Sequence, residues 1–185
     1  MVIEEINRGN PARIFGEMLT LIEDSKRNPD ASLELTYTIP GDQSDSGRIY
    51  IPENFYIIGT MNIADRSLAM VDLALRRRFA FYTLKPSFGN KWKQWIGKVI
   101  DESIVNVVED RLNKLNQIIA EDSRLGPQFA IGHSYFTPDV NKPIENHQNW
   151  FNDIVEFEII PLIEEYWFDD IKKIEDLKKS LYLPQ

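Results

Sequence analysis

The chain has 185 residues, 43% of them apolar, which is enough for one good-sized domain, or a domain with a small appendage, around a real core. Its 29 acidic residues outnumber the 21 basic ones, and the formal charge of −8 disfavours non-specific contacts with nucleic-acid phosphates, so a DNA role needs another domain or chain. The lack of cysteine excludes disulfides and thiolate metal sites and fits a cytoplasmic protein, and no apolar run reaches the roughly 18 residues of a membrane span.

The chain begins with a strand pattern followed by a helix pattern. A short apolar run that starts at Val2 predicts a strand, and this strand ends in two adjacent glutamates. Asn10 and Pro11 are residue types preferred at a helix N-cap and in its first turn. Apolar residues at helical spacing then predict one continuous helix that runs to about Asp24.

Strand patterns dominate the next fifty residues. Residues 33–39 alternate like a half-buried strand, and the pattern returns at 48–51 after a cluster of turn residues, which predicts a β-hairpin. The apolar run 54–62 is typical of a buried parallel strand. A short helix over 67–75 and another strand over 77–84 are expected to follow.

Beyond Pro86 the pattern becomes helical. Apolar residues three and four apart over 92–122 predict one or two helices. Two closing helices are expected over 149–167 and 171–182, and Pro161 should kink or interrupt the first of them. The sequence thus predicts a β/α part followed by an all-helical part.

Glu4 and Glu5 are the first candidates for chemistry. Carboxylates at the end of a buried strand are used in phosphoryl-transfer sites to hold magnesium and to orient water. The alternative is a strand end at which two carboxylates simply reach solvent, since burying ionised carboxylates without partners is costly.

Asn62, Asp65 and Arg66 follow the second apolar strand in the segment GTMNIADRS. Ligands of parallel α/β sheets bind at the carboxyl ends of the strands, so Asn62 should lie at the same edge as the two glutamates. The alternative is that Asn62 and Asp65 serve only as turn or helix-capping residues.

Three consecutive arginines, residues 76–78, precede the last predicted strand. Such crowding of positive charge is unfavourable unless anions neutralise it. One interpretation is an arginine finger that neutralises a transferring phosphoryl group. The other is a solvated basic turn paired with surface acids.

Together these segments resemble an AAA+ nucleotide hydrolase from its Walker B strand onward. More narrowly, EINRGN…FGE…LIE, MNIADRSLAMVDLALRRRF and GHSYF resemble the GTP-hydrolysing McrB subunits of modified-cytosine-specific restriction systems. The resemblance implies an α/β fold with a partial AAA+ parallel sheet: the Walker B strand, the sensor-1 strand, a final strand and a β-hairpin. It implies the rear half of the nucleotide-hydrolase core over residues 1–86 and a helical lid domain over 87–185.

The resemblance also implies roles for the residues at one edge of the sheet. Glu4 takes the Walker B position, usually Asp, that holds Mg²⁺ through water, and Glu5 polarises the attacking water. Asn62 takes the position of the sensor for the γ-phosphate or that water. Asp65 and Arg66 belong to the family's MNxxDRS signature and are expected to form a polar network beside it.

The remaining roles concern neighbouring copies and the lid. Arg77 and Arg78 match the residues that reach into the next subunit of a ring, expected to be a hexamer, and such a contact requires a heterologous interface. His133 and Ser134 lie where AAA+ lids carry a second sensor. The alternative for His133 is a structural residue in an apolar loop.

The 185 residues contain no G-x-x-x-x-G-K-[ST] phosphate-binding loop. We therefore expect the C-terminal part of a ring-forming GTPase that is inactive by itself, with Mg²⁺ and GTP, or ATP, bound only in the full-length protein. The resemblance implies a nuclease subunit as partner, DNA contacts through regions not present here, and no membrane. Two alternatives are an ATP-hydrolysing remodeller of the dynein-related or MoxR kind and a non-catalytic module that joins or poisons the ring.

Overall fold

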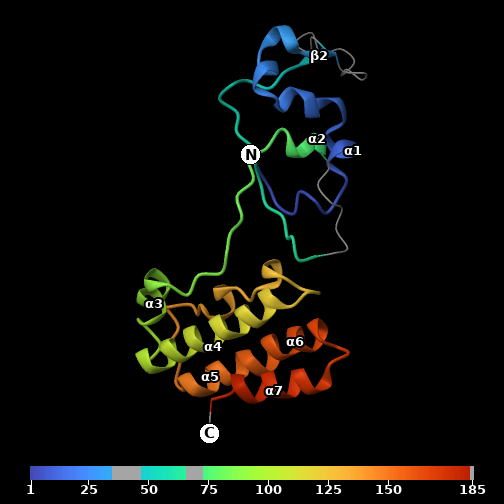
Figure 1. Ribbon diagram of the computed structural model, residues 1–185. Helices are drawn as coiled ribbons and strands as arrows, with labels where there is room; N and C mark the ends of the chain where they lie inside the picture. Colours follow the sequence, from blue (N-terminus) through green and yellow to red (C-terminus); the bar gives the residue numbers. More distant parts are fainter. Residues whose placement is uncertain (35–46, 66–72, 184–185) are drawn as a thin grey trace. The chain divides into compact units, whose positions relative to one another are not determined.

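The computed structural model describes residues 1–34, 47–65 and 73–183, and the chain forms two compact units, Met1–Thr83 and Leu84–Gln185 (Figure 1). The first unit contains the short strands and the second is entirely helical. This α/β part followed by an all-helical part is the fold class expected from the sequence. Among the described residues, no helix combines the length and the apolar character needed to cross a membrane.

The first unit contains two small sheets. Strand β1 (Val2–Ile3) pairs in parallel with β4 (Ile58–Gly59), with Val2 opposite Ile58. Strands β2 (Leu33–Glu34) and β3 (Arg48–Ile49) pair antiparallel and form the base of the predicted hairpin, of which residues 35–46 lie outside the described residues. The parallel pairing was predicted, but the burial was not observed, because 61% of Ile58 is exposed.

The helix predicted from Asn10 to about Asp24 forms only in part. Helix α1 (Pro11–Phe15) begins as expected, with the Arg13 N–H donating to the Asn10 side-chain oxygen at 3.1 Å. Gly16 then adopts a φ of +52°, in the left-handed region, and the chain continues as a 3₁₀ helix, η1 (Gly16–Ile22). The prediction of one continuous helix was wrong because Gly16 allows a conformation that ends the α-helical turn.

Two further 3₁₀ turns, η2 (Asp24–Lys26) and η3 (Pro29–Ala31), lead to β2. Helix α2 (Leu73–Arg76) is the described end of the helix predicted over 67–75, and residues 67–72 lie outside the described residues. Leu75 packs with Leu19 and Ile22 to form the small core of this unit.

The strand predicted over 77–84 does not form. Phe81, Tyr82 and Leu84 are exposed, and neither sheet of the described chain includes this segment. A strand is stabilised by hydrogen bonds to a neighbour, so an alternating pattern without such a neighbour remains an extended segment. The prediction failed for this reason.

The second unit is a bundle of helices, in which α4, the continuous stretch from α5 to α6, and α7 lie side by side (Figure 1). The helical segments are α3 (Asn90–Ile96), α4 (Glu102–Glu121), η4 (Pro127–Phe129), η5 (His133–Phe136), α5 (His147–Ile154), η6 (Val155–Ile159), α6 (Ile160–Tyr166) and α7 (Ile171–Leu181). Helix α4 buries Val105, Val108, Leu112, Leu115 and Ile119, at the predicted spacing of three and four.

Pro161 interrupts the α-helical hydrogen-bond pattern of a long helix, as predicted. The chain stays helical from α5 to α6, but the two are joined by η6, a π-helical turn that ends two residues before the proline. Proline has no N–H to donate to the preceding turn, and its ring clashes with that turn, so the wider π-helical turn relieves the conflict.

Asp122 ties the end of α4 to the segment that joins α6 and α7. Its carboxylate accepts hydrogen bonds from the Trp167 indole N–H at 2.7 Å, the Lys173 ammonium at 2.9 Å and the Arg124 backbone N–H at 2.9 Å. The Lys173 ammonium also lies 4.3 Å from the centre of a Trp167 ring. The hydrogen bonds from Trp167, Lys173 and Arg124, in that order of size, hold the pKa of Asp122 well below its usual range.

We predict that Asp122→Ala lowers the free energy of unfolding by about 2 kcal/mol at pH 7, because charged hydrogen bonds are lost and a buried indole N–H is left without its acceptor. The lowered pKa means that this stabilisation is complete above the unfolded-state pKa of about 4 and is lost as the pH falls through the folded-state pKa. Urea unfolding at pH 7 and pH 3 measures both effects. Asp153→Ala, at an exposed position of α5, is the control. Equal stability of the two variants at pH 7 would contradict the role of Asp122.

Candidate functional site

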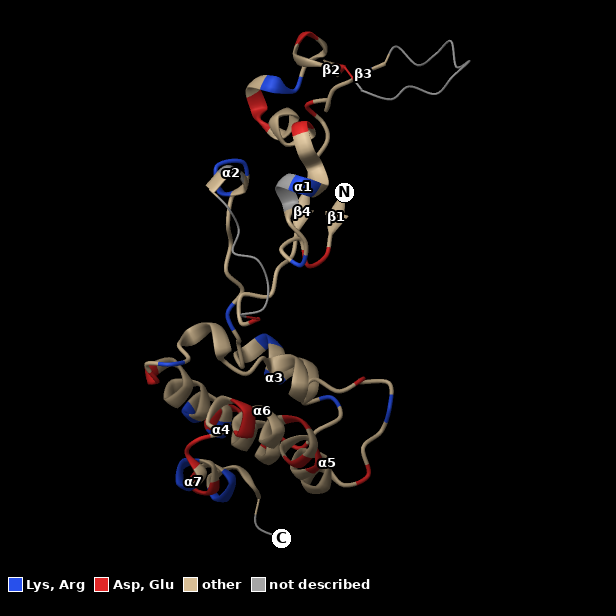
Figure 2. Cartoon of the chain, turned by 90° about the vertical axis from the view of Figure 1, so that its right-hand side faces the viewer, with Lys and Arg blue, Asp and Glu red and all other residues tan. Residues whose placement is uncertain are grey.

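The carboxyl ends of β1 and β4 continue side by side beyond the strands. The Ile6 N–H donates to the Thr60 carbonyl at 2.9 Å, and the Glu5 N–H donates to the Thr60 hydroxyl at 3.3 Å. The acidic turn after β1 therefore lies next to the chain that leaves β4 (Figure 2). This pairing brings the Glu4-Glu5 turn and the Asn62 loop to one edge, as the sequence predicted.

Glu5 has an unusual backbone conformation in this turn. Its φ is +50°, in the left-handed region that residues with a side chain rarely adopt. Its exposed carboxylate accepts a hydrogen bond from Arg8 at 2.5 Å. Exposed ion pairs contribute little to stability, so the Glu5 carboxylate can exchange Arg8 for another partner at small cost. Glu4 is exposed beside it.

Asn62 ends the segment that follows β4. Its side-chain oxygen accepts a hydrogen bond from the Ala64 N–H at 3.0 Å, which is the turn-capping contact considered as one alternative from the sequence. The side-chain nitrogen carries the two donors suited to a phosphate or water oxygen. Asp65 is exposed in the same loop, and Arg66 lies outside the described residues.

Asn7 is part of this edge, although no role was predicted for it from the sequence. Only 6% of it is exposed, and among the residues that the structure describes it is the one buried polar residue. Its side-chain nitrogen donates to the Asn62 carbonyl at 3.4 Å. Asn7 therefore joins the turn that carries Glu5 to the loop that carries Asn62. The sequence signal that could have identified Asn7 was its place in the EINRGN segment.

The structure separates the two candidate arginines. Arg77 is exposed, whereas only 14% of the Arg78 side chain is exposed and its guanidinium lies 2.5 Å from a carboxylate oxygen of Glu23. Arg27 is similarly enclosed and donates to the Ile22 and Phe55 carbonyls at 3.0 and 2.8 Å. Glu23 and Arg27 were not candidates from sequence, because Glu23 binds Arg78 and Arg27 binds the Phe55 carbonyl, both distant along the chain.

His133 and Ser134 lie in the helical unit, at the start of η5. The His133 Nδ1 accepts a hydrogen bond from the Ser87 N–H at 3.4 Å, and its ring meets the edge of Phe88. Ser134 is exposed. His133 thus has a local structural contact, while the sensor role remains a prediction.

The carboxylates at this edge belong to the ligand type that a magnesium ion prefers. No group of three or more His, Asp or Glu side chains in the described ranges is arranged to hold a metal. Mg²⁺ commonly keeps several waters and uses only one or two carboxylates together with substrate phosphates. Glu4, the residue expected from the sequence to hold the ion through water, offers one exposed carboxylate of this kind.

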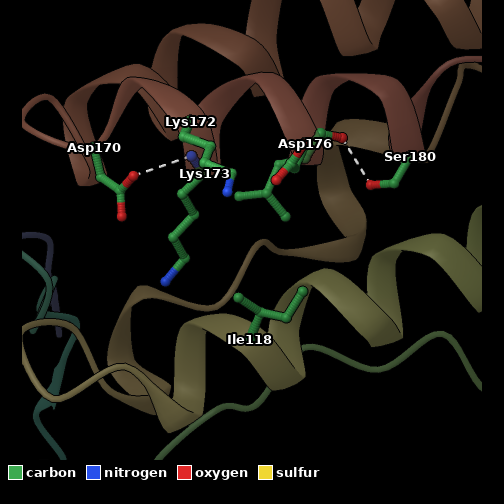
Figure 3. A pocket seen from close by; sticks show the side chains of 7 residues that line it. Ile118, Asp170, Lys172, Lys173, Asp176 and Ser180 are labelled. Atoms are coloured by element: carbon green, nitrogen blue, oxygen red, sulfur yellow. Dashed lines mark hydrogen bonds between the residues drawn. The ribbon is translucent and has the colours of Figure 1, made fainter.

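A separate hollow lies between α4 and α7 in the helical unit (Figure 3). Ile118 forms one side of it, and α7 forms the other. Lys173, one of its lining residues, is already bound to Asp122. The hollow includes none of the residues that the sequence singled out, so it is not the predicted site.

Both units of the chain match known protein families. Residues 1–79 match the family described as AAA domain (dynein-related subfamily), and residues 107–175 match McrB, alpha-helical lid domain. The chain is 44% identical over 172 residues to the Type IV methyl-directed restriction enzyme EcoKMcrB subunit of Escherichia coli K12, which covers 91% of this chain and 37% of that protein. It is 32% identical over 155 residues to the Type II restriction enzyme BsuMI component YdiS of Bacillus subtilis 168, covering 77% of this chain and 45% of that protein. The chain therefore spans less than half the length of either relative.

The backbone of Glu5 leads to a prediction about stability. We expect Glu5→Gly to be more stable than Glu5→Ala by about 1 kcal/mol, because glycine adopts a positive φ without the steric cost that a Cβ imposes. Both variants lack the carboxylate and its contact with Arg8, so their difference isolates the backbone. Urea unfolding of the two variants measures it. An alanine variant as stable as the glycine variant would show that Glu5 is not strained.

Proposed function

This chain belongs to the AAA+ proteins of the McrB type. We therefore propose that it forms part of the nucleotide-hydrolysis site, and the helical lid, of a nucleotide-hydrolysing subunit of a DNA restriction system. The observation that carries the proposal is the parallel pairing of β1 with β4, which brings the Glu5 turn beside the Asn62 loop. Phosphoryl transfer needs such a carboxylate and a polar group held near one another, to orient water and the γ-phosphate.

Each residue at this edge has a proposed role. Glu5 orients and polarises the attacking water, and the Asn62 side-chain nitrogen donates to that water or to the γ-phosphate. Glu4 holds Mg²⁺ through water, and the ion when bound neutralises charge on the β- and γ-phosphates. Asp65 and Arg66, the latter outside the described residues, are proposed to support Asn62, as the MNxxDRS signature suggests. Asn7 fixes the distance between the two segments.

The phosphates themselves need a cradle that these residues do not supply. We propose that a phosphate-binding loop outside the 185 residues provides it, since the sequence contains no G-x-x-x-x-G-K-[ST] motif. The 185-residue chain alone is then inactive. His133 and Ser134 of the lid are candidates for contact with the nucleotide.

The subunit is proposed to work in a ring of like copies, with six as the expected number. The exposed guanidinium of Arg77 then reaches the nucleotide of the neighbouring subunit, through an interface that joins two different faces. A nuclease subunit is the proposed partner that cuts DNA. The acidic charge of this chain supports DNA contacts through other regions or chains.

GTP is the proposed nucleotide, by analogy with McrB-type subunits. An ATP-hydrolysing remodeller is the second candidate, because residues 1–79 match the dynein-related AAA subfamily. Competition between GTP and ATP for the complete protein distinguishes the two.

We predict that Glu5→Gln in the complete protein abolishes hydrolysis while nucleotide still binds and rings still assemble. The substitution removes the water-orienting charge and leaves the groups that hold the phosphates unchanged. Turnover, nucleotide titration and sedimentation measure the three properties. Glu53→Gln, at an exposed carboxylate of the same unit, is the control. Near-normal turnover in the Glu5 variant would remove Glu5 from this role.

We predict that Arg77→Ala lowers hydrolysis by about 10³-fold, as expected for the loss of an arginine finger. Rings mixed from Arg77→Ala and Glu5→Gln subunits should recover part of the activity, because some interfaces then combine an intact Glu5 with an intact Arg77. Arg13→Ala, at an exposed arginine of α1, should leave turnover unchanged. If mixed rings stay inactive, Arg77 acts within its own subunit.

A further inference from the structure

Arg77 and Arg78 are neighbours in sequence, but they lie in opposite environments. Arg77 is exposed, whereas the Arg78 guanidinium is largely enclosed and forms an ion pair with Glu23, 55 residues away in the chain. The turn that carries both arginines follows α2 (Figure 2). A side chain held inward and an adjacent side chain held outward give this turn a defined orientation.

Two contacts hold the turn against η1. Leu75, one helical turn before Arg78, packs against Leu19 and Ile22. The ion pair to Glu23 then adds a charged contact at the residue after Ile22. The apolar contact fixes where α2 lies, and the ion pair fixes how the following turn is rotated.

The charge of Arg78 makes the pairing with Glu23 specific. An enclosed guanidinium cannot lose its proton, so a carboxylate that neutralises it stabilises its enclosed position. Glu23 keeps 41% of its side chain exposed, so it reaches Arg78 from the surface. Removal of this carboxylate weakens the hold on Arg78, and a rotation of the turn then moves Arg77 as well.

We propose that Glu23 is a positioning residue for the turn that carries Arg77 and Arg78, here called the arginine turn. Glu23 retains Arg78 within its own subunit and thereby presents Arg77 to the neighbouring subunit. The two arginines then have different roles, Arg78 as an internal anchor and Arg77 as the group that acts across the interface. This assignment rests on the proposed function, because it presumes hydrolysis at a shared interface.

The test is Glu23→Gln in the complete, ring-forming protein, with GTP turnover as the readout. The expected result is a fall in kcat of about 10- to 100-fold, the range expected when a reacting group is misplaced without being removed. The KM for GTP is expected to stay nearly unchanged, because the subunit's own nucleotide site is intact. Glu17→Gln, at an exposed carboxylate of η1, is the matched control with normal turnover.

Mixed rings separate positioning from a structural effect. Mixing Glu23→Gln with Glu5→Gln restores part of the activity, because some interfaces then join an intact Glu5 site to an intact arginine turn. Mixing Glu23→Gln with Arg77→Ala restores none, because both defects lie on the same side of the interface. The reverse pattern would show that Glu23 acts on its own nucleotide site, and would overturn the proposal.

If the Glu23→Gln variant does not fold, Glu23→Asp is the variant to test in its place. It keeps the charge but shortens the side chain by one methylene, and the expected result is a smaller fall in kcat with the same mixed-ring pattern. Wild-type turnover in every folded Glu23 variant would overturn the positioning role while leaving the proposed function intact. If instead Glu5→Gln and Arg77→Ala also turn over normally, the proposed function itself fails.

Discussion

The parallel pairing of β1 with β4 is the contact on which the candidate site depends. The Thr60 N–H donates to the Ile3 carbonyl at 2.9 Å, and the Ile6 N–H returns a bond of the same length to the Thr60 carbonyl. These bonds join segments about 55 residues apart and set the register that places the Glu5 turn beside the Asn62 loop. A shift by one residue would reverse the faces to which the side chains point. The position of the candidate site is thus a consequence of backbone register.

Burial divides the polar residues of this unit into two groups. Asn7 and Arg78 are enclosed and bind groups of their own chain, Asn62 and Glu23 respectively. Glu4, Glu5, Asn62 and Arg77, which were chosen for chemistry from the sequence, are exposed, where their contacts can be exchanged. Enclosed polar groups need fixed partners, because an unpaired buried donor or charge is costly. Enclosed residues therefore hold the segments in place, and exposed ones remain available to a nucleotide or a neighbouring subunit.

In the helical unit, too, enclosed polar groups are bound to partners of the same chain. Its apolar core determines which helices pack together, and Asp122 closes the end of the bundle by accepting from Trp167 and Lys173. His133 contributes to local order through its bond with the Ser87 N–H.

The sequence by itself determined the features that depend on neighbours along the chain: the buried stripe of α4, the capping of α1 by Asn10 and the family to which the two units belong. It also placed Glu5 and Asn62 at one edge, since parallel strands align their carboxyl ends. Only the tertiary structure showed that the predicted strand over 77–84 has no partner in the described sheets and that Arg78 binds Glu23. Periodicity and capping are local, whereas strand pairing and ion pairing are decided by groups that only folding brings together.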